Sequence, residues 1–238
     1  MRLCRGMLIA SIVSILTVQV ATASSAAEPP SKGKRVNSPN RKALIHRFTM
    51  ELREVRSHFL GVELVQIPTD NWTMQEIISE IDPDFIIETG TYKGGSALYY
   101  ASLLDALTKD GKVITVDVVM QHEKAASFDL FRRRVQFIDG DSVAAETIEK
   151  ISMSVKPEHT VVVTLDSLHN PVHVGKELEL YSKFVSVGSY IIVQDMFYGG
   201  MPQAVEKFLK KHPNFERDIA RERYLFTKYR GGFLKRVH

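Results

Sequence analysis

The 238-residue sequence has one cysteine, Cys4, which lies in the first few residues of the chain. No internal disulfide is therefore possible, and the rest of the chain offers no thiolate for a metal or iron–sulfur centre. A marked excess of charge of one sign is also missing, because 31 Lys and Arg stand against 28 Asp and Glu. Without a dense basic stripe, and with only the short cluster of Arg132, Arg133 and Arg134, the sequence predicts no nucleic-acid partner.

Internal repeats are absent, and the main part of the chain shows no second change in composition. Hydrophobic residues make up 44% of the sequence and charged residues 25%, which is the balance of an ordinary globular protein with a buried core. We therefore expect a single domain behind a separate N-terminal segment.

The N-terminal 27 residues follow the three-part pattern of a secretory signal peptide. Two arginines precede an apolar run from Met7 to Val20, and the small residues ATASSAA come after it. The run is short and contains Ser, Thr and Gln, so it does not indicate a full membrane span of ~20 residues. An uncleaved signal anchor and an organelle presequence remain alternatives. We predict that residues 1–27 direct export or anchor the chain in a membrane, with the body on the non-cytoplasmic side.

Residues 28–40, EPPSKGKRVNSPN, are rich in Pro, Ser and Lys and lack hydrophobic periodicity, so they predict an exposed linker. The folded domain is expected over 41–238. Its first segment, 41–60, places apolar residues three and four positions apart, which predicts an amphipathic helix. These residues are Leu44, Ile45, Phe48, Leu52, Val55 and Phe59.

From residue 84 onward, short apolar runs alternate with helical patterns, which predicts an α/β fold with a parallel sheet covered by helices. The expected strands are 85–89, 112–117, 135–139, 160–166 and 189–195. An acidic residue stands in or at the end of each strand, and the carboxyl ends of parallel strands share one edge of the sheet. The acids expected to converge there are Glu88, Asp117, Asp139, Asp166 and Asp195. Each of them, taken singly, could instead cap the helix that follows.

The C-terminal stretch predicts an antiparallel hairpin beside the parallel strands. Residues 224–229 and 233–237 have the composition of strands, and Arg230-Gly231-Gly232 between them has that of a turn.

A glycine-rich segment, ETGTYKGGS (88–96), links the first of these strands to a helical pattern. Glycines in such a turn let a ligand approach the backbone and the helix N-terminus. Tyr92 stands where a dinucleotide-binding loop has its second glycine, so NAD is disfavoured, and the P-loop pattern is absent. S-adenosylmethionine, which carries no phosphate, fits better, although the loop taken alone could be a structural turn. The residues expected to bind this cofactor are Glu88, Gly90, Thr91, Tyr92, Gly95, Ser96, Asp117, Asp139, Asp141 and Ser142.

Eight stretches of the chain, covering most of residues 61–237 in order, resemble the cephalosporin hydroxylase and rhamnosyl O-methyltransferase family. The pattern P-T-D-N-W-T-M-Q-E-I (68–77) and the ending G-G-F-L-K-R-V (231–237) are its most specific features. The other matching stretches include DFIIETGTYKGGSALYYASLL (84–104), IDGDSV (138–143) and LDSLHNPVHVGKELELY (165–181). The resemblance implies a Rossmann-like, doubly wound, mostly parallel seven-stranded sheet of class I methyltransferase type.

The resemblance also implies methyl transfer from S-adenosylmethionine to a hydroxyl of a sugar-containing or other small-molecule acceptor, with a glycolipid as one option. In related sugar O-methyltransferases an aspartate and a Glu-Asp pair hold a divalent metal, and a histidine acts as base. The matching positions here are Asp166, Gln194, Asp195 and His169. Oxygen ligands suit Mg²⁺, a metal lowers the pKa of a bound hydroxyl, and an imidazole can accept the proton.

Gln194 departs from the family pattern, which has glutamate at this position. The substitution removes a negative charge but keeps a carbonyl oxygen, so we expect a metal-assisted reaction with weakened metal binding, against the alternative of a metal-free or degenerate site. His173 is the competing candidate for the base, and the alternative is that it is a solvated helix residue with no catalytic role.

Two other functions remain open: a hydroxylase, for which the body offers no cysteine cluster or histidine-rich iron site, and a non-catalytic protein that binds S-adenosylmethionine. The acceptor pocket is expected between 61–75 and 196–201. Homo-oligomerisation and membrane association through the N-terminal segment stay open.

Overall fold

The computed structural model describes residues 43–44, 47–48, 51, 56–107 and 110–238. Contacts divide the chain into two units, 1–33 and 34–238, and the first lies wholly outside the described residues. The predicted signal segment and the linker 28–40 are therefore not described. Among the described residues, no helix has the length and apolar character needed to cross a membrane.

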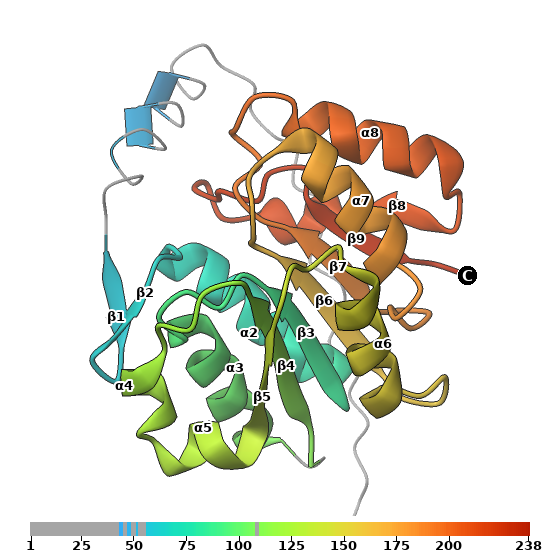
Figure 1. The fold of residues 1–238 in the computed structure, drawn as a ribbon. Coiled ribbons are helices and arrows are strands. Elements are labelled where there is room, and N and C mark those ends of the chain that lie inside the picture. The colour runs from blue at the N-terminus through green and yellow to red at the C-terminus, as the bar shows by residue number, and fades with distance from the viewer. Residues whose placement is uncertain (1–42, 45–46, 49–50, 52–55, 108–109) are drawn as a thin grey trace, which may run out of the picture. The chain divides into compact units, whose positions relative to one another are not determined.

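The second unit is built around a seven-stranded sheet (Figure 1). Its strands are β3 (Phe85–Thr89), β4 (Lys112–Asp117), β5 (Val135–Asp139), β6 (Val161–Leu165), β7 (Tyr190–Val193), β8 (Phe215–Arg217) and β9 (Phe233–Arg236). In space they run in the order β5-β4-β3-β6-β7-β9-β8. The first five are parallel, whereas β9 is antiparallel to both of its neighbours, β7 and β8. The order reverses between β3 and β6, which is where open α/β sheets bind ligands.

Helices cover both faces of this sheet (Figure 1). The helices are α2 (Pro68–Ile81), α3 (Gly95–Ala106), α4 (Glu123–Ala126), α5 (Asp129–Arg134), α6 (Ala145–Ser154), α7 (Pro171–Tyr181), α8 (Met201–Lys211) and the 3₁₀ helix η1 (Ile219–Glu222). A separate two-stranded sheet, β1 (Ser57–Phe59) with β2 (Val62–Leu64), contacts α3.

Alternating side chains of the strands explain why both faces need helices. Ile86 of β3 packs with α2, α3 and α5, whereas its neighbour Ile87 packs with α6, α7 and α8. The same alternation recurs in β6, where Val162 and Val163 face opposite cores. Because both faces are apolar, the strand sequences are nearly continuous hydrophobic runs, as expected of buried parallel strands.

All five predicted parallel strands are present, although two are shorter than predicted. The strand predicted at 160–166 spans Val161–Leu165, and the one predicted at 189–195 spans Tyr190–Val193. Asp166 and Asp195 therefore lie in the loops after β6 and β7, not within the strands. Asp195 has a positive φ of 48°, which ends the strand direction two residues after β7.

Two predictions near the ends of the domain are wrong. The helix predicted over 41–60 cannot include its last residues, because Ser57–Phe59 is a strand paired with β2. Residues 43–44, 47–48 and 51 are helical, and the rest of 41–55 lies outside the described residues. At the C-terminus, 224–229 forms no strand, and the antiparallel partners of β9 are β7 and β8, both of which lie before η1. The sequence pattern indicated a tight turn, which is a local signal. The pairing of β8 with β9 instead spans a longer connection, which no local pattern indicated.

Candidate functional site

A cavity of about 690 Å³ opens at the carboxyl ends of β3, β4, β5, β6 and β7. It joins the glycine loop at one side to the acidic residues after β6 and β7 at the other. Of the predicted site residues, the lining includes Gly90, Thr91, Tyr92, Gly95, Ser96, Asp117, Asp141, Ser142, Asp166, His169, Gln194 and Asp195. Glu88 and Asp139 do not line it. The predicted convergence of strand-end residues is thus found, with these two exceptions at its margin.

The glycine loop is held by the carboxylate of Asp117, at the end of β4. One carboxylate oxygen, Oδ2, accepts the backbone N–H groups of Thr91 and Tyr92, both at 2.9 Å. The other, Oδ1, accepts the N–H of Val119 at 3.1 Å. Two successive N–H groups thus point toward the same acceptor, and the chain then turns at Tyr92, which has a positive φ of 48°.

Two glycines of the loop are required by close backbone contacts. A Cβ on Gly90 would lie 2.1 Å from the carbonyl oxygen of Asp166, and Gly90 also has a positive φ of 87°. A Cβ on Gly95 would lie 2.1 Å from the carbonyl oxygen of Glu63, at the middle of β2. Gly90 therefore lets β3 approach the loop after β6, and Gly95 lets β2 cross the start of α3.

The two predicted residues outside the lining have different surroundings. The Glu88 side chain is fully buried beneath the glycine loop, and its Oε2 accepts a hydrogen bond from the Thr115 hydroxyl at 2.7 Å. Burial raises the pKa of Glu88 to about 7, and hydrogen bonds from Ser96 and Thr115 oppose this shift. Asp139, at the end of β5, is exposed.

The end of the cavity near β5 carries a polar cluster that includes His173. Its Nε2 is 3.0 Å from the Ser142 hydroxyl and 3.5 Å from Glu177 Oε1. The same Glu177 oxygen accepts a hydrogen bond from the Ser167 hydroxyl at 2.7 Å, and the Glu177 side chain is fully buried. The hydrogen bond with Glu177 raises the pKa of His173. This cluster fixes the hydroxyls of Ser142 and Ser167 at the cavity wall.

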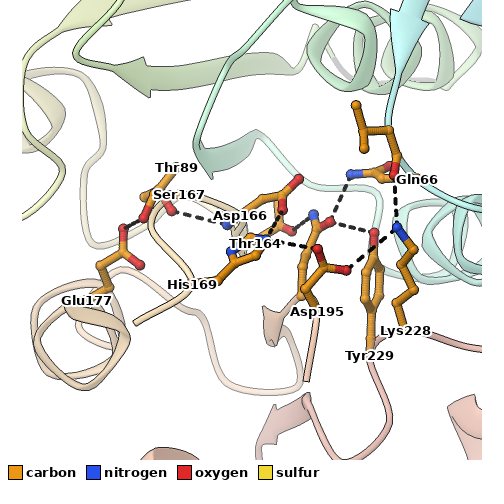
Figure 2. Close-up of polar contacts among 12 residues, drawn as sticks. Gln66, Thr89, Thr164, Asp166, Ser167, His169, Glu177, Asp195, Lys228 and Tyr229 are labelled. Atoms are coloured by element: carbon orange, nitrogen blue, oxygen red, sulfur yellow. Dashed lines mark hydrogen bonds and ion pairs between the residues drawn. The ribbon is translucent and has the colours of Figure 1, made fainter. Parts of the chain in front are cut away.

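At the other end, Asp166, His169 and Asp195 bring three possible metal-ligand atoms within 4.8 Å of one another (Figure 2). His169 Nε2 lies 2.8 Å from Asp195 Oδ2 and 3.8 Å from Asp166 Oδ1. Burial lowers the pKa of His169, which favours the neutral imidazole. Burial, reinforced by the charge of Asp195, raises the pKa of Asp166 well above its ordinary value. Both pKa shifts favour the neutral form of the side chain, because burial in the pocket penalises charge.

Gln194 borders this cluster, but its polar atoms are engaged elsewhere. The carbonyl oxygen accepts hydrogen bonds from the Gln66 side chain at 3.1 Å and the Tyr229 hydroxyl at 2.5 Å. The amide nitrogen donates to the Thr164 hydroxyl at 2.8 Å. Since a carbonyl oxygen has two lone pairs, both acceptor sites of Gln194 are used.

Lys228 is a site residue that the sequence reasoning missed. Its ammonium lies 3.9 Å from Asp195 Oδ1 and 3.3 Å from the carbonyl oxygen of Val65, and only 5% of the side chain is exposed (Figure 2). Gln66 and Tyr229 were missed as well, although all three fall in stretches that match the family. A lysine among the aromatic residues of YLFTKY was the available signal, because lysine is seldom buried without a partner.

The chain matches the family model described as Rhamnosyl O-methyltransferase/CmcI over residues 53–237. A rhamnosyl O-methyltransferase of Mycobacterium bovis (strain BCG / Pasteur 1173P2) is 31% identical over 198 residues, which cover 76% of this chain and 78% of that protein. One of Mycobacterium leprae (strain TN) is 30% identical over 192 residues, covering 75% and 82%. A solved structure of CmcI with Mg and SAM has a TM-score of 0.60 at 21% identity and covers 76% of this chain and 77% of that one. This likeness confirms the predicted fold class.

Proposed function

Because the chain belongs to the rhamnosyl O-methyltransferase/CmcI family, we propose that it transfers a methyl group from S-adenosylmethionine to a hydroxyl of a sugar-containing acceptor. The single observation that carries this proposal is the cavity at the carboxyl ends of the strands. It unites a glycine loop suited to the cofactor with a histidine and two carboxylates suited to activating a hydroxyl.

The cofactor is assigned to the side of the cavity formed by β3, β4 and β5. The glycine loop and the N-terminus of α3 supply backbone N–H groups for the carboxylate of the methionine moiety. Asp117 is assigned to the ribose hydroxyls, and Asp141 and Ser142 to the adenine. Ser142 suits this role because His173 holds its hydroxyl at 3.0 Å.

Asp166 and Asp195 fit Mg²⁺, since both present hard carboxylate oxygens at one point of the cavity. A bound Mg²⁺ would lower the pKa of the acceptor hydroxyl. Gln194 remains part of the proposed metal set only if its carbonyl oxygen gives up a hydrogen bond from Gln66 or Tyr229.

His169 is the proposed general base. The carboxylate of Asp195 can accept the Nε2–H of the neutral ring, which leaves Nδ1 as the ring's acceptor for the hydroxyl proton. The acceptor oxygen forms a bond to the methyl carbon as the carbon–sulfur bond breaks. The proton passes to His169, and S-adenosylhomocysteine leaves.

The proposal is tested by titration calorimetry of the full chain with S-adenosylmethionine, followed by transfer of a labelled methyl group to a panel of glycosides and phenols. We expect micromolar cofactor binding and labelling of a glycoside. Tight binding without transfer to any acceptor would support the non-catalytic alternative, and no binding would overturn the proposal.

A further inference from the structure

A buried ammonium group lies inside the carboxylate cluster. Lys228 Nζ approaches Asp195 Oδ1 at 3.9 Å, and its only other polar contact in the described residues is the Val65 carbonyl oxygen at 3.3 Å. Long charged side chains rarely lie so deep without a functional or structural reason. The proposed mechanism assigns no role to this charge.

The fold fixes the segment that carries Lys228. Asp70, fully buried in the first turn of α2, accepts the backbone N–H of Lys228 through Oδ2 at 2.9 Å. The adjacent Thr69 donates its hydroxyl to the carbonyl oxygen of Phe226 at 2.8 Å. The P-T-D part of the family-like motif therefore clamps residues 226–228 against the cavity. These two hydrogen bonds fix the backbone that carries Lys228, so the fold positions the lysine beside the carboxylate cluster.

The other neighbour of the cluster, Gln194, adds no negative charge. Its amide belongs to the hydrogen-bonded set of Gln66, Thr164 and Tyr229. The cluster thus contains two carboxylates, one histidine and one fixed ammonium. A divalent cation that binds Asp195 must approach a positive charge that the chain already supplies.

We propose that Lys228 is the resident cation of this site and that it opposes divalent metal binding through Asp195. Two like charges a few ångströms apart repel strongly in a buried pocket, so the ammonium lowers the affinity of Asp166 and Asp195 for Mg²⁺. Lys228 acts on Asp195 and is therefore a positioning residue. The inference rests on the proposed function only in taking this cluster as the metal site.

The test is a titration of the full chain with Mg²⁺, and separately with Mn²⁺, by calorimetry without S-adenosylmethionine. The variants Lys228→Met and Lys228→Gln remove the charge, and the glutamine keeps a donor for the Val65 carbonyl oxygen. We expect both to bind Mg²⁺ at least about tenfold more tightly than the wild type. Lys228→Arg keeps the charge and should bind Mg²⁺ as the wild type does.

Lys112→Met is the matched control, because it removes an exposed lysine at the opposite end of the sheet, at the start of β4. It should leave metal affinity unchanged. The midpoint of thermal unfolding, measured with and without Mg²⁺, provides a second readout and shows that each variant is folded. The metal-induced rise should be larger in both neutral variants than in the wild type.

A merely structural Lys228 would give the opposite sign, because its loss would loosen Asp195 and weaken metal binding. Unchanged, weaker or undetectable Mg²⁺ binding in a folded neutral variant would therefore overturn the inference. A titration of the same preparations with S-adenosylmethionine separates this outcome from failure of the proposed function, since cofactor binding does not depend on the sign of the metal effect.

Discussion

The two ends of the cavity are built in different ways. At the cofactor end, the backbone N–H groups of Thr91 and Tyr92 bind one carboxylate, Asp117, and all of these groups belong to one β-loop-α-β pattern. At the carboxylate end, side chains separated by more than one hundred residues meet, as in the bond between Gln66 and Gln194. A local pattern specifies the first end, whereas only the assembled fold creates the second.

The difference extends to electrostatics. Backbone N–H groups supply fixed partial charges at the cofactor end. At the carboxylate end, Asp166 and His169 both have a pKa shifted toward the neutral form by burial. A region that penalises charge in this way strengthens each remaining electrostatic interaction and suits proton transfer.

The largest expected effect comes from comparing two histidines, one at each end. His169→Ala should lower kcat by about 10²–10⁴-fold and leave the dissociation constant for S-adenosylmethionine within about twofold, because a base is lost but no cofactor contact is. His173→Ala should weaken cofactor binding and keep kcat at saturating cofactor, because it removes contacts with Ser142 and Glu177 but no proposed base. Steady-state kinetics and calorimetry on both variants make the comparison. Loss of turnover in His173→Ala with full activity in His169→Ala would reverse the assignment of the base.

Gly90 lies where the cofactor end of the cavity packs against the carboxylate end. In Gly90→Ala the new methyl group would collide with the carbonyl oxygen of Asp166, and the positive φ of 87° adds strain. We expect a loss of about 3 kcal/mol in the free energy of unfolding, measured with urea. Gly175→Ala in α7 is the matched control, because nothing lies within 4 Å of its Cβ position. It should stabilise the protein by about 0.5–1 kcal/mol. A loss of well under ~1 kcal/mol in Gly90→Ala would show that Gly90 and the loop after β6 are not closely packed.

A smaller effect is expected from the buried carboxyl beneath the cofactor end. The pKa of Glu88 is about 7 in the folded protein and near 4.5 when exposed, so between these values the folded state keeps a proton that the unfolded state releases. Stability should fall as the pH rises through this window and level off above pH ~7. Glu88→Gln should remove about 2 kcal/mol of that fall, measured by urea unfolding between pH ~5 and ~7.5. Asp70, whose pKa is also about 7, would maintain the remaining slope. Equal pH dependence in the two proteins would contradict the buried, protonated state of Glu88.

Much of the fold could be predicted because its signals are local. Short runs rich in β-branched residues, such as VVVTL (161–165), favour buried strands, and the helical patterns between them favour a parallel order. Strand ends were less predictable, since no glycine or proline separates Asp166 and Asp195 from the strands that precede them. The predicted hairpin partner of β9 was wrong for a related reason: the strand at its outer side, β8, has three residues and no periodicity of its own.

The candidate site divides in the same way. The glycine loop and Asp117 could be predicted because spacing along one chain segment fixes them. The surroundings of Gln194 could not, because its partners Gln66 and Tyr229 come from distant segments. The sequence shows a glutamine at position 194, but only the packing shows which groups its side chain binds.

The crossing of β2 over Gly95 links the two ends of the cavity through one short segment. The carbonyl oxygen of Glu63 rests against the start of α3, and the same extended segment ends three residues later at Gln66, beside the carboxylate cluster. Because only three positions separate the two contacts, a shift of this segment at Gln66 would also move the backbone that packs against the start of α3. We therefore expect occupancy of one subsite to alter affinity at the other.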